Sequence, residues 1–153
     1  MYHFFPRGKE QMAGEIVRYA AALYAEMIDR AFAAFRDPTD AVAAIFVAEA
    51  KMLQSSGYRN GCPVASVALD ITSTVEKVRK PCAEAFALWI DAYARGIAKS
   101  GVALEVAADL AGYVLAALEG AIVLSRTAKS ADPIERTGWL VCQTLKAQLP
   151  RVA

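Results

Sequence analysis

Residues 110–124 read LAGYVLAALEGAIVL, and Glu119 is the only charged residue among them. Folded as a helix, this stretch is apolar on nearly every face, so it must be buried on more than one side. Its 15 residues are fewer than the roughly 20 that a membrane span needs, so we expect a buried helix and no membrane partner. A chain of 153 residues cannot easily enclose such a helix by itself. We therefore predict a homodimer in which a second subunit covers its outer side.

The rest of the chain carries apolar patterns of helical period and none that is typical of a strand. The first helix is expected to begin near Gly8 or Lys9 and to end at Asp37–Pro38, because the residue before a proline is pushed out of helical geometry. Its expected apolar stripe is Met12, Ile16, Tyr19, Leu23, Met27, Ala31 and Phe35. Further helices are expected from Thr39 or Asp40 to Gly57, from Pro63 to Ile71, from Ser73 to Gly101 with a kink or a fresh start at Pro81, from Val102 to Lys129, and from Asp132 to Pro150. The predicted fold class is all-α.

Composition favours a single domain without a polyanion-binding surface of its own. The hydrophobic fraction is 56%, the mean hydropathy is +0.29, and 17 basic against 16 acidic residues leave a net charge of +1. The three cysteines, Cys62, Cys82 and Cys142, form no CxxC pair. This pattern argues against a disulfide framework or a zinc site and favours a reducing, cytoplasmic location.

Residues for catalysis are scarce. The chain has one histidine, His3, which excludes a Ser-His-Asp site in the body of the domain and a di-iron bundle. No GxGxxG, GxxxxGK[ST] or HExxH motif occurs. A carboxylate pair assembled in space from Glu49, Asp109 and Glu119 is the remaining catalytic alternative. We expect no enzyme, no catalytic residue, no metal and no cofactor.

Three segments carry a resemblance to a known family. Residues 2–12, YHFFPRGKEQM, resemble the YHHFPGGKEQL signature of TetR-family repressors, although Phe4 and Arg7 depart from it. Residues 60–65, NGCPVA, and residues 118–124, LEGAIVL, resemble segments of the LmrA/YxaF branch of that family. The three matches stand in the family's order along the chain.

The resemblance implies helices four to nine of the TetR fold, with the last two forming a four-helix bundle across a dimer. It also implies a helix-turn-helix upstream, so that residues 1–12 would be the end of that domain and the start of the connecting helix, and residues 13–153 the ligand-binding and dimerisation domain. Tyr2 and Lys9 are the phosphate contacts carried over by resemblance. Lys9 is equally well interpreted as a solvated first-turn residue. Operator DNA is expected as a partner only together with the helix-turn-helix.

The resemblance further implies an effector cavity among the helices. Aromatic walls with a few polar tips are typical of ligand pockets, and the candidate lining residues are Phe46, Glu49, Leu53, Trp89, Tyr93 and Tyr113. Trp89 and Tyr93 lie four residues apart, so their rings are expected to stack along one wall. The alternative is that these aromatic residues belong to an ordinary core.

Glu49 is the sharper signal because it falls within an apolar stripe, where burying a carboxylate without a partner is costly. It either meets an Arg or Tyr inside the protein, turns outward, or faces a wet cavity. The cavity would admit a small hydrophobic effector, with a cationic group as one option. Glu119 has the same ambiguity, with the dimer interface as its alternative environment.

The leading hypothesis is the effector-sensing and dimerising body of a TetR-type repressor, in which a small molecule controls DNA binding by an upstream helix-turn-helix. The alternative is a stand-alone helical dimer that binds a small molecule or a partner protein without DNA.

Overall fold

A computed structural model describes residues 8–71 and 76–150, and every regular element in these ranges is a helix. The helices are α1 (Gly8–Ala34), α2 (Pro38–Ser55), α3 (Pro63–Ile71), α4 (Glu76–Ala98), α5 (Leu104–Ala128) and α6 (Asp132–Gln148). The predicted all-α class is confirmed. The expected capping box at residues 73–76 falls mainly outside the described residues.

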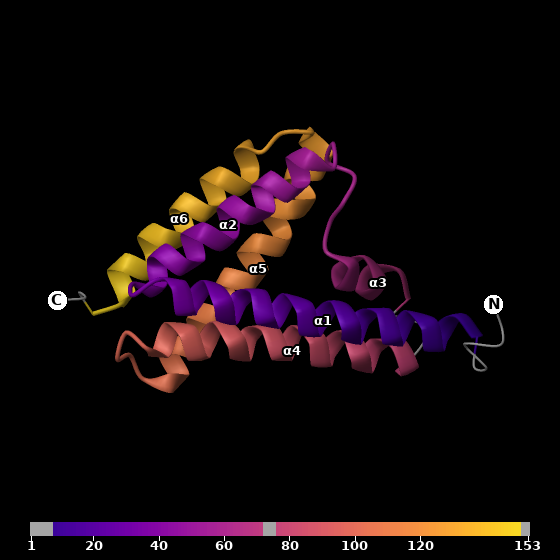
Figure 1. The fold of residues 1–153 in the computed structure, drawn as a ribbon, viewed down its shortest axis with the longest axis horizontal. Coiled ribbons are helices and arrows are strands. Elements are labelled where there is room, and N and C mark those ends of the chain that lie inside the picture. Colours follow the sequence, from indigo (N-terminus) through magenta and orange to yellow (C-terminus); the bar gives the residue numbers. More distant parts are fainter. Residues whose placement is uncertain (1–7, 72–75, 151–153) are drawn as a thin grey trace.

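The helices form two groups (Figure 1). In one group α1 and α4 lie side by side along their length, and the short α3 packs on both. In the other group α2 and α5 both contact α6. Helix α5 joins the groups because it also packs against α4. A single hydrophobic core runs through all six helices.

The N-cap of α2 lies two residues before Thr39, the earlier of the two caps expected from the sequence. Asp37 is the N-cap, and its carboxylate accepts a hydrogen bond of 2.8 Å from the Thr39 backbone N–H. Pro38 occupies the first turn, where the missing N–H has no partner to lose. The expected caps Thr39 and Asp40 therefore lie inside the helix. A proline that was expected to end one helix also starts the next.

The buried face of α1 differs from the predicted stripe. Ile16, Tyr19, Leu23 and Phe35 are exposed, Tyr19 by 69%, and the packed positions are Val17, Ala21, Ala25, Ile28 and Phe32. The predicted stripe was on the wrong face because the buried face of α1 is made partly of alanines, which a search for large apolar residues does not find. Alanines allow α1 to lie close to α4, whereas the large side chains project outward.

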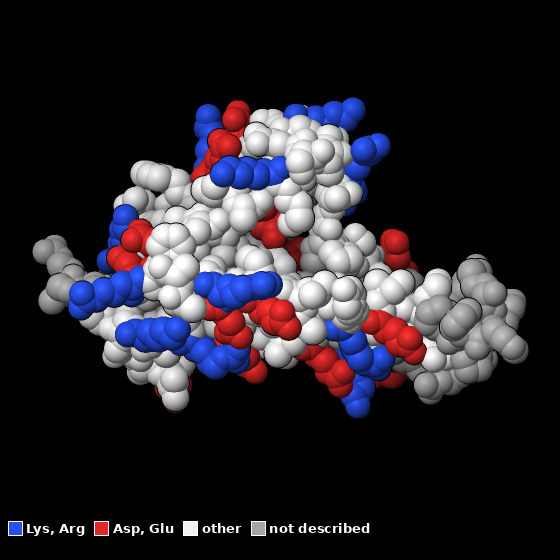
Figure 2. Space-filling view, in the orientation of Figure 1, with Lys and Arg blue, Asp and Glu red and all other residues white. Residues whose placement is uncertain are grey.

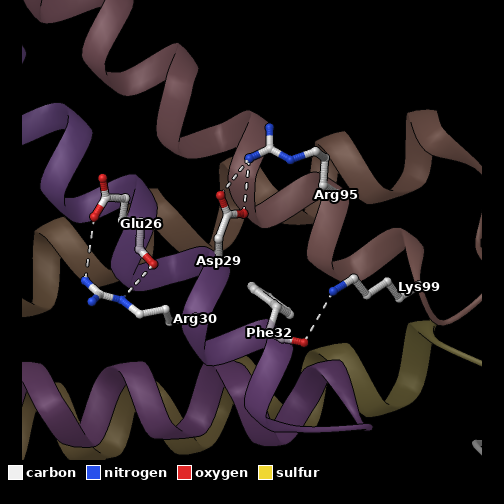
Figure 3. A network of polar contacts seen from close by, with 6 residues as sticks. All are labelled: Glu26, Asp29, Arg30, Phe32, Arg95 and Lys99. Carbon is white, nitrogen blue, oxygen red and sulfur yellow. Dashed lines mark hydrogen bonds and ion pairs between the residues drawn. The ribbon is translucent and has the colours of Figure 1, made fainter.

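Close contact between α1 and α4 is visible at Gly96, where an added Cβ would overlap the ring of Phe32. The rims of the same interface are polar (Figure 3). Arg95 reaches both oxygens of Asp29 at 3.1 and 3.2 Å, and Lys99 Nζ donates to the Phe32 carbonyl at 3.4 Å. The helices α1 and α4 are thus joined by close packing of Phe32 on Gly96 and by exposed polar contacts at the edge of their interface.

Helix α4 continues through Pro81, so the expected fresh start there is wrong. Pro81 lies in the second turn, where a proline removes only one backbone hydrogen bond. The predicted apolar side is confirmed for the described residues, because Val78, Cys82, Trp89, Tyr93 and Ile97 are buried and Phe86 is partly buried.

Helix α5 is long and apolar enough to cross a membrane by composition alone, with a mean hydropathy of 1.7 over its most apolar window. It nevertheless packs against α4 and α6, and Val114, Leu118 and Ile122 lie in the common core. Its outer face stays apolar and uncovered by this chain, since Val123 and Leu124 are exposed. Trp139 and Leu140 extend this uncovered surface onto α6.

Candidate ligand site

Glu49 lies on the inner face of α2 and is only 6% exposed. The outward orientation considered from the sequence is therefore excluded. Among the residues that the structure describes, no Lys or Arg nitrogen lies within 4.0 Å of its carboxylate. An internal ion pair with arginine is excluded in the same part of the chain. Glu49 instead meets the hydroxyl of Tyr24 on α1, which is the internal tyrosine contact considered from the sequence.

Three polar side chains from other elements interact with this carboxyl, and one of them, Glu119, interacts in turn with Cys62. Tyr24 comes from α1, Cys62 from the residue before α3, Tyr93 from α4 and Glu119 from α5. We call these residues, together with Glu49, the polar cluster. Five segments that are distant in the sequence thus meet at one buried point, and none of them supplies a basic group to it.

The two carboxyl groups of the polar cluster are both harder to ionise than usual. Burial raises the pKa of Glu49 to about 7, the Tyr24 hydroxyl opposes that rise, and the negative charge of Glu119 adds to it. Burial also raises the pKa of Glu119, against a favourable interaction with the Cys62 thiol. Near neutral pH one of these carboxyl groups can therefore hold a proton, which neutralises its charge in the absence of a basic neighbour.

The Cys62 thiol stays protonated in this environment. Burial, reinforced by the charge of Glu119, raises its pKa to about 12. Its sulfur accepts a hydrogen bond of 3.3 Å from the Ala65 backbone N–H at the start of α3. A thiol with so little thiolate is a poor nucleophile and a poor metal ligand.

Tyr93 is fully buried, and among the residues that the structure describes none makes a hydrogen bond of standard geometry to its hydroxyl. This hydroxyl lies next to the Tyr24 hydroxyl, which is the side chain it interacts with most strongly, and it also interacts with the charges of Glu49 and Glu119, so it faces the polar cluster. Burial raises the pKa of Tyr93 well above its usual range, and that of Tyr24 likewise. A buried hydroxyl without a partner is unusual enough to need a functional explanation.

Aromatic rings form one side of the cluster. The rings of Tyr24 and Trp89 are tilted at 56° with centroids 4.8 Å apart, and Phe86 meets Trp89 edge-on at 5.6 Å. Trp89 Nε1 donates to the Ala21 carbonyl at 2.9 Å, which fixes the indole against α1. Tyr93 packs edge-on against Phe32 at 6.1 Å. The expected contact between the Trp89 and Tyr93 rings is replaced by separate contacts of each ring with α1.

The other predicted lining residues lie in three different environments. Phe46 packs against Gly138 of α6, where an added Cβ would come within 2.8 Å of it, and Leu53 lies in the core of the same helix group. Tyr113 is exposed on α5, and its hydroxyl lies 3.5 Å from Thr144 Oγ1. Lys9 lies in the first turn of α1, and Tyr2 is outside the described residues.

The structure therefore brings together Glu49, Trp89 and Tyr93 from the predicted set and adds Tyr24, Cys62 and Glu119. Figure 2 shows a hollow on this face of the molecule, between α1 and the block formed by α2, α5 and α6, with acidic side chains at its bottom. Within the described ranges, no group of three His, Cys, Asp or Glu residues is arranged to hold a metal ion. The polar cluster thus combines two carboxyl groups with neighbouring aromatic rings.

Comparison with known proteins gives a consistent result. The family described as "Transcriptional regulator LmrA/YxaF-like, C-terminal domain" matches residues 38–138. The HTH-type transcriptional regulator YxaF of Bacillus subtilis is 31% identical over 134 residues, which cover 88% of this chain and 70% of that protein. LmrA of the same organism is 29% identical over 134 residues, covering 88% of this chain and 71% of LmrA.

A crystal structure of a TetR transcriptional regulator from Legionella pneumophila has the same fold, with a TM-score of 0.81 at 18% identity. The superposition covers 94% of this chain and 76% of the Legionella protein. The helical fold, the family match and the sequence relatives agree, and the chain belongs to the TetR family of transcriptional regulators, in its LmrA/YxaF-like branch.

Proposed function

We propose that this chain is the effector-sensing and dimerising body of a TetR-family regulator, and that a small molecule bound at the polar cluster controls DNA binding by a helix-turn-helix domain. The observation that carries the proposal is the buried carboxyl of Glu49, which lacks a basic partner and lies beside the unpartnered Tyr93 hydroxyl. Polar groups buried in a core without such partners lower the stability of the fold. Their presence is explained if a bound ligand supplies the missing partner.

The position of Tyr24 supplies a route from effector to DNA. Tyr24 lies in the middle of α1, and the first residues of α1 resemble the junction with the DNA-binding domain in the family. A ligand that contacts Tyr24 and Glu49 binds between α1 and α2, so its binding favours one relative position of these helices. Population shift between two positions of α1 would then change the spacing of two DNA-reading domains in a dimer.

We also propose that α5 and α6 form the dimer interface. Leu124, Trp139 and Leu140 are each more than half exposed. An open groove of about 430 Å³ lies on α6 and is lined by Glu135, Arg136, Trp139 and Leu140. Large apolar residues exposed on two neighbouring helices favour an interaction site, and in a symmetric dimer a second copy of the same face would cover them on both subunits.

The alternative of a stand-alone dimer without a DNA-binding role is the weaker proposal, because the named relatives are HTH-type transcriptional regulators. Those relatives also favour a non-catalytic role in the cytoplasm. The carboxylate pair considered as a catalytic alternative is partly realised by Glu49 and Glu119, but Asp109 is exposed on α5 outside the polar cluster.

A thermal-shift screen of small molecules against the purified chain tests the effector proposal. Binding to the folded state raises the melting temperature with ligand concentration. We expect compounds that do so for the wild type and lose the effect in Tyr24→Ala, which removes the ring between α1 and the cluster. Tyr19→Ala, an exposed tyrosine on the same helix, is the matched control. Stabilising compounds that act equally on Tyr24→Ala would place binding elsewhere and contradict the proposal.

A further inference from the structure

We propose that the effector is an organic amine whose ammonium group lies between Glu49 and Glu119 and donates a hydrogen bond to Tyr93 Oη. This inference rests on the proposed function, because it names the chemical class that the polar cluster accepts. Two independent observations lead to it. One is the pair of carboxyl groups without a cation, and the other is the buried hydroxyl without a partner.

Hydrogen-bonding capacity determines the kind of group that fits. Ionised Glu49 and Glu119 can only accept hydrogen bonds, and the hydroxyl oxygen of Tyr93 has a free lone pair. A protonated primary amine has three donors and no acceptor. It therefore satisfies both carboxylates and the Tyr93 oxygen at once, with no unmatched group of its own.

Charge leads to the same class. The titratable groups that face Glu49 are Tyr24 from α1, Tyr93 from α4 and Glu119 from α5, and Cys62 stands behind Glu119. All of these are neutral or negative at neutral pH. A cation brought among them is attracted by the carboxylates, whereas an anion is repelled. A neutral ligand leaves the repulsion between the two carboxylates unrelieved.

The aromatic side of the cluster fits the apolar part of such a ligand. Trp89 is held in place by its hydrogen bond to Ala21, and its ring packs against those of Tyr24 and Phe86. A cation next to aromatic faces also gains from the ring quadrupoles. The ligand class is therefore an aryl-alkyl or similar hydrophobic amine.

Calorimetric titration of the 153-residue chain tests the class with probes that differ only in charge. The amines are benzylamine, phenethylamine and naphthylmethylamine, and each is compared with the alcohol and the carboxylate of the same skeleton. We expect at least one amine to bind about tenfold more tightly than its alcohol at pH 8, the size of a hydrogen bond to a charged group. The carboxylates should not bind.

Three variants locate the ammonium group. Glu49→Gln and Tyr93→Phe should each weaken the amine about tenfold and leave the alcohol unchanged. Tyr93→Phe removes only a hydroxyl that has no partner, so it keeps the fold even if Glu49→Gln does not. Glu26→Gln removes an exposed carboxylate of α1 that pairs with Arg30 at 4.0 Å, and it should change nothing.

Proton linkage gives an additional readout. Because an ammonium group replaces the proton held by Glu49, affinity for the amine should rise between pH 6 and pH 8, and this rise should be absent in Glu49→Gln. Failure of every amine to bind more tightly than its alcohol overturns the inference. If alcohols bind and Tyr24→Ala abolishes that binding, the effector site stands and only the ligand class is wrong. If no ligand of any charge depends on Tyr24, the proposed function itself fails.

Discussion

At the scale of single residues, Glu49 makes the stability of the protein depend on pH. Its pKa of about 7 in the folded state lies above the ordinary value of 4.5, so the folded protein binds more protons than the unfolded chain between these values. The stabilisation is complete at a pH below the ordinary pKa of 4.5, and it is lost as the pH rises through the folded-state pKa of about 7. The difference corresponds to roughly 3 kcal/mol of unfolding free energy.

Urea denaturation of the wild type and Glu49→Gln at pH 5.5 and pH 8 measures this effect. We expect the wild type to be less stable at pH 8, and Glu49→Gln to be more stable than the wild type at pH 8, by up to about 3 kcal/mol. Equal protein concentrations are needed because dimerisation contributes to stability. A large loss of stability in Glu49→Gln would instead mean that the carboxylate has a partner essential to the fold.

The sequence singled out Glu49 because the residue falls among Ile45, Phe46 and Leu53 on a helix with an apolar face, but it left open whether the side chain points inward or outward. It did not predict Tyr24. Tyr24 follows Leu23, and the predicted apolar stripe of α1 ran through Leu23 and left Tyr24 off the buried face. The sequence offered Glu49, Asp109 and Glu119 as a possible carboxylate pair but could not say which two meet, since that depends on how α2 and α5 lie relative to one another.

At the scale of elements, the helix ends were predictable and the helix faces were less so. Proline and glycine act locally: Pro63 and Pro133 lie in first turns, and Gly101 has a positive φ of 90° after α4. The face of α1 instead depends on which neighbour it packs against. Alanine is compatible with either side of a helix, so hydrophobicity alone did not separate Ala21 and Ala25 from the exposed large residues.

Gly96 provides a test of the close packing between α1 and α4. Gly96→Ala places a Cβ against the Phe32 ring, and such overpacking typically destabilises by about 1–3 kcal/mol. Gly112→Ala is the matched control in a helix, because open space surrounds that position and alanine is the better helix former by about 1 kcal/mol. Denaturation should show a loss for the first variant and no loss for the second. Equal stability of both variants would mean that α1 and α4 are further apart than described.

At the scale of the whole molecule, the uncovered face of α5 and α6 predicts the state of assembly. Trp139→Arg should convert a dimer to a monomer, because it puts a charge in the centre of an apolar interface. Tyr19→Arg changes an aromatic residue of similar exposure on α1 and should leave the dimer intact. Sedimentation velocity at micromolar concentration measures both. A dimer that survives Trp139→Arg but is broken by Tyr19→Arg would place the interface on α1.

The all-round apolar character of residues 110–124 indicated from the sequence that one chain alone could not cover this helix. The structure agrees in that α5 is packed on one side only by its own chain. Which residues lie on the uncovered side could not be read from a stretch that is apolar everywhere. The packing of α4 and α6 on α5 decides it: Val114 and Leu118 are buried, and Val123 and Leu124 are exposed.

The most direct test of an effector site at the polar cluster is the fluorescence of Trp89, which lies 4.8 Å from the Tyr24 ring. In a Trp139→Phe background, Trp89 is the only tryptophan of the chain. A compound that raises the melting temperature should change the Trp89 emission with the same concentration dependence, and Tyr93→Phe should weaken both effects together. Stabilising compounds that leave the Trp89 emission unchanged, or whose effects are the same in Tyr93→Phe, would contradict the location of the site.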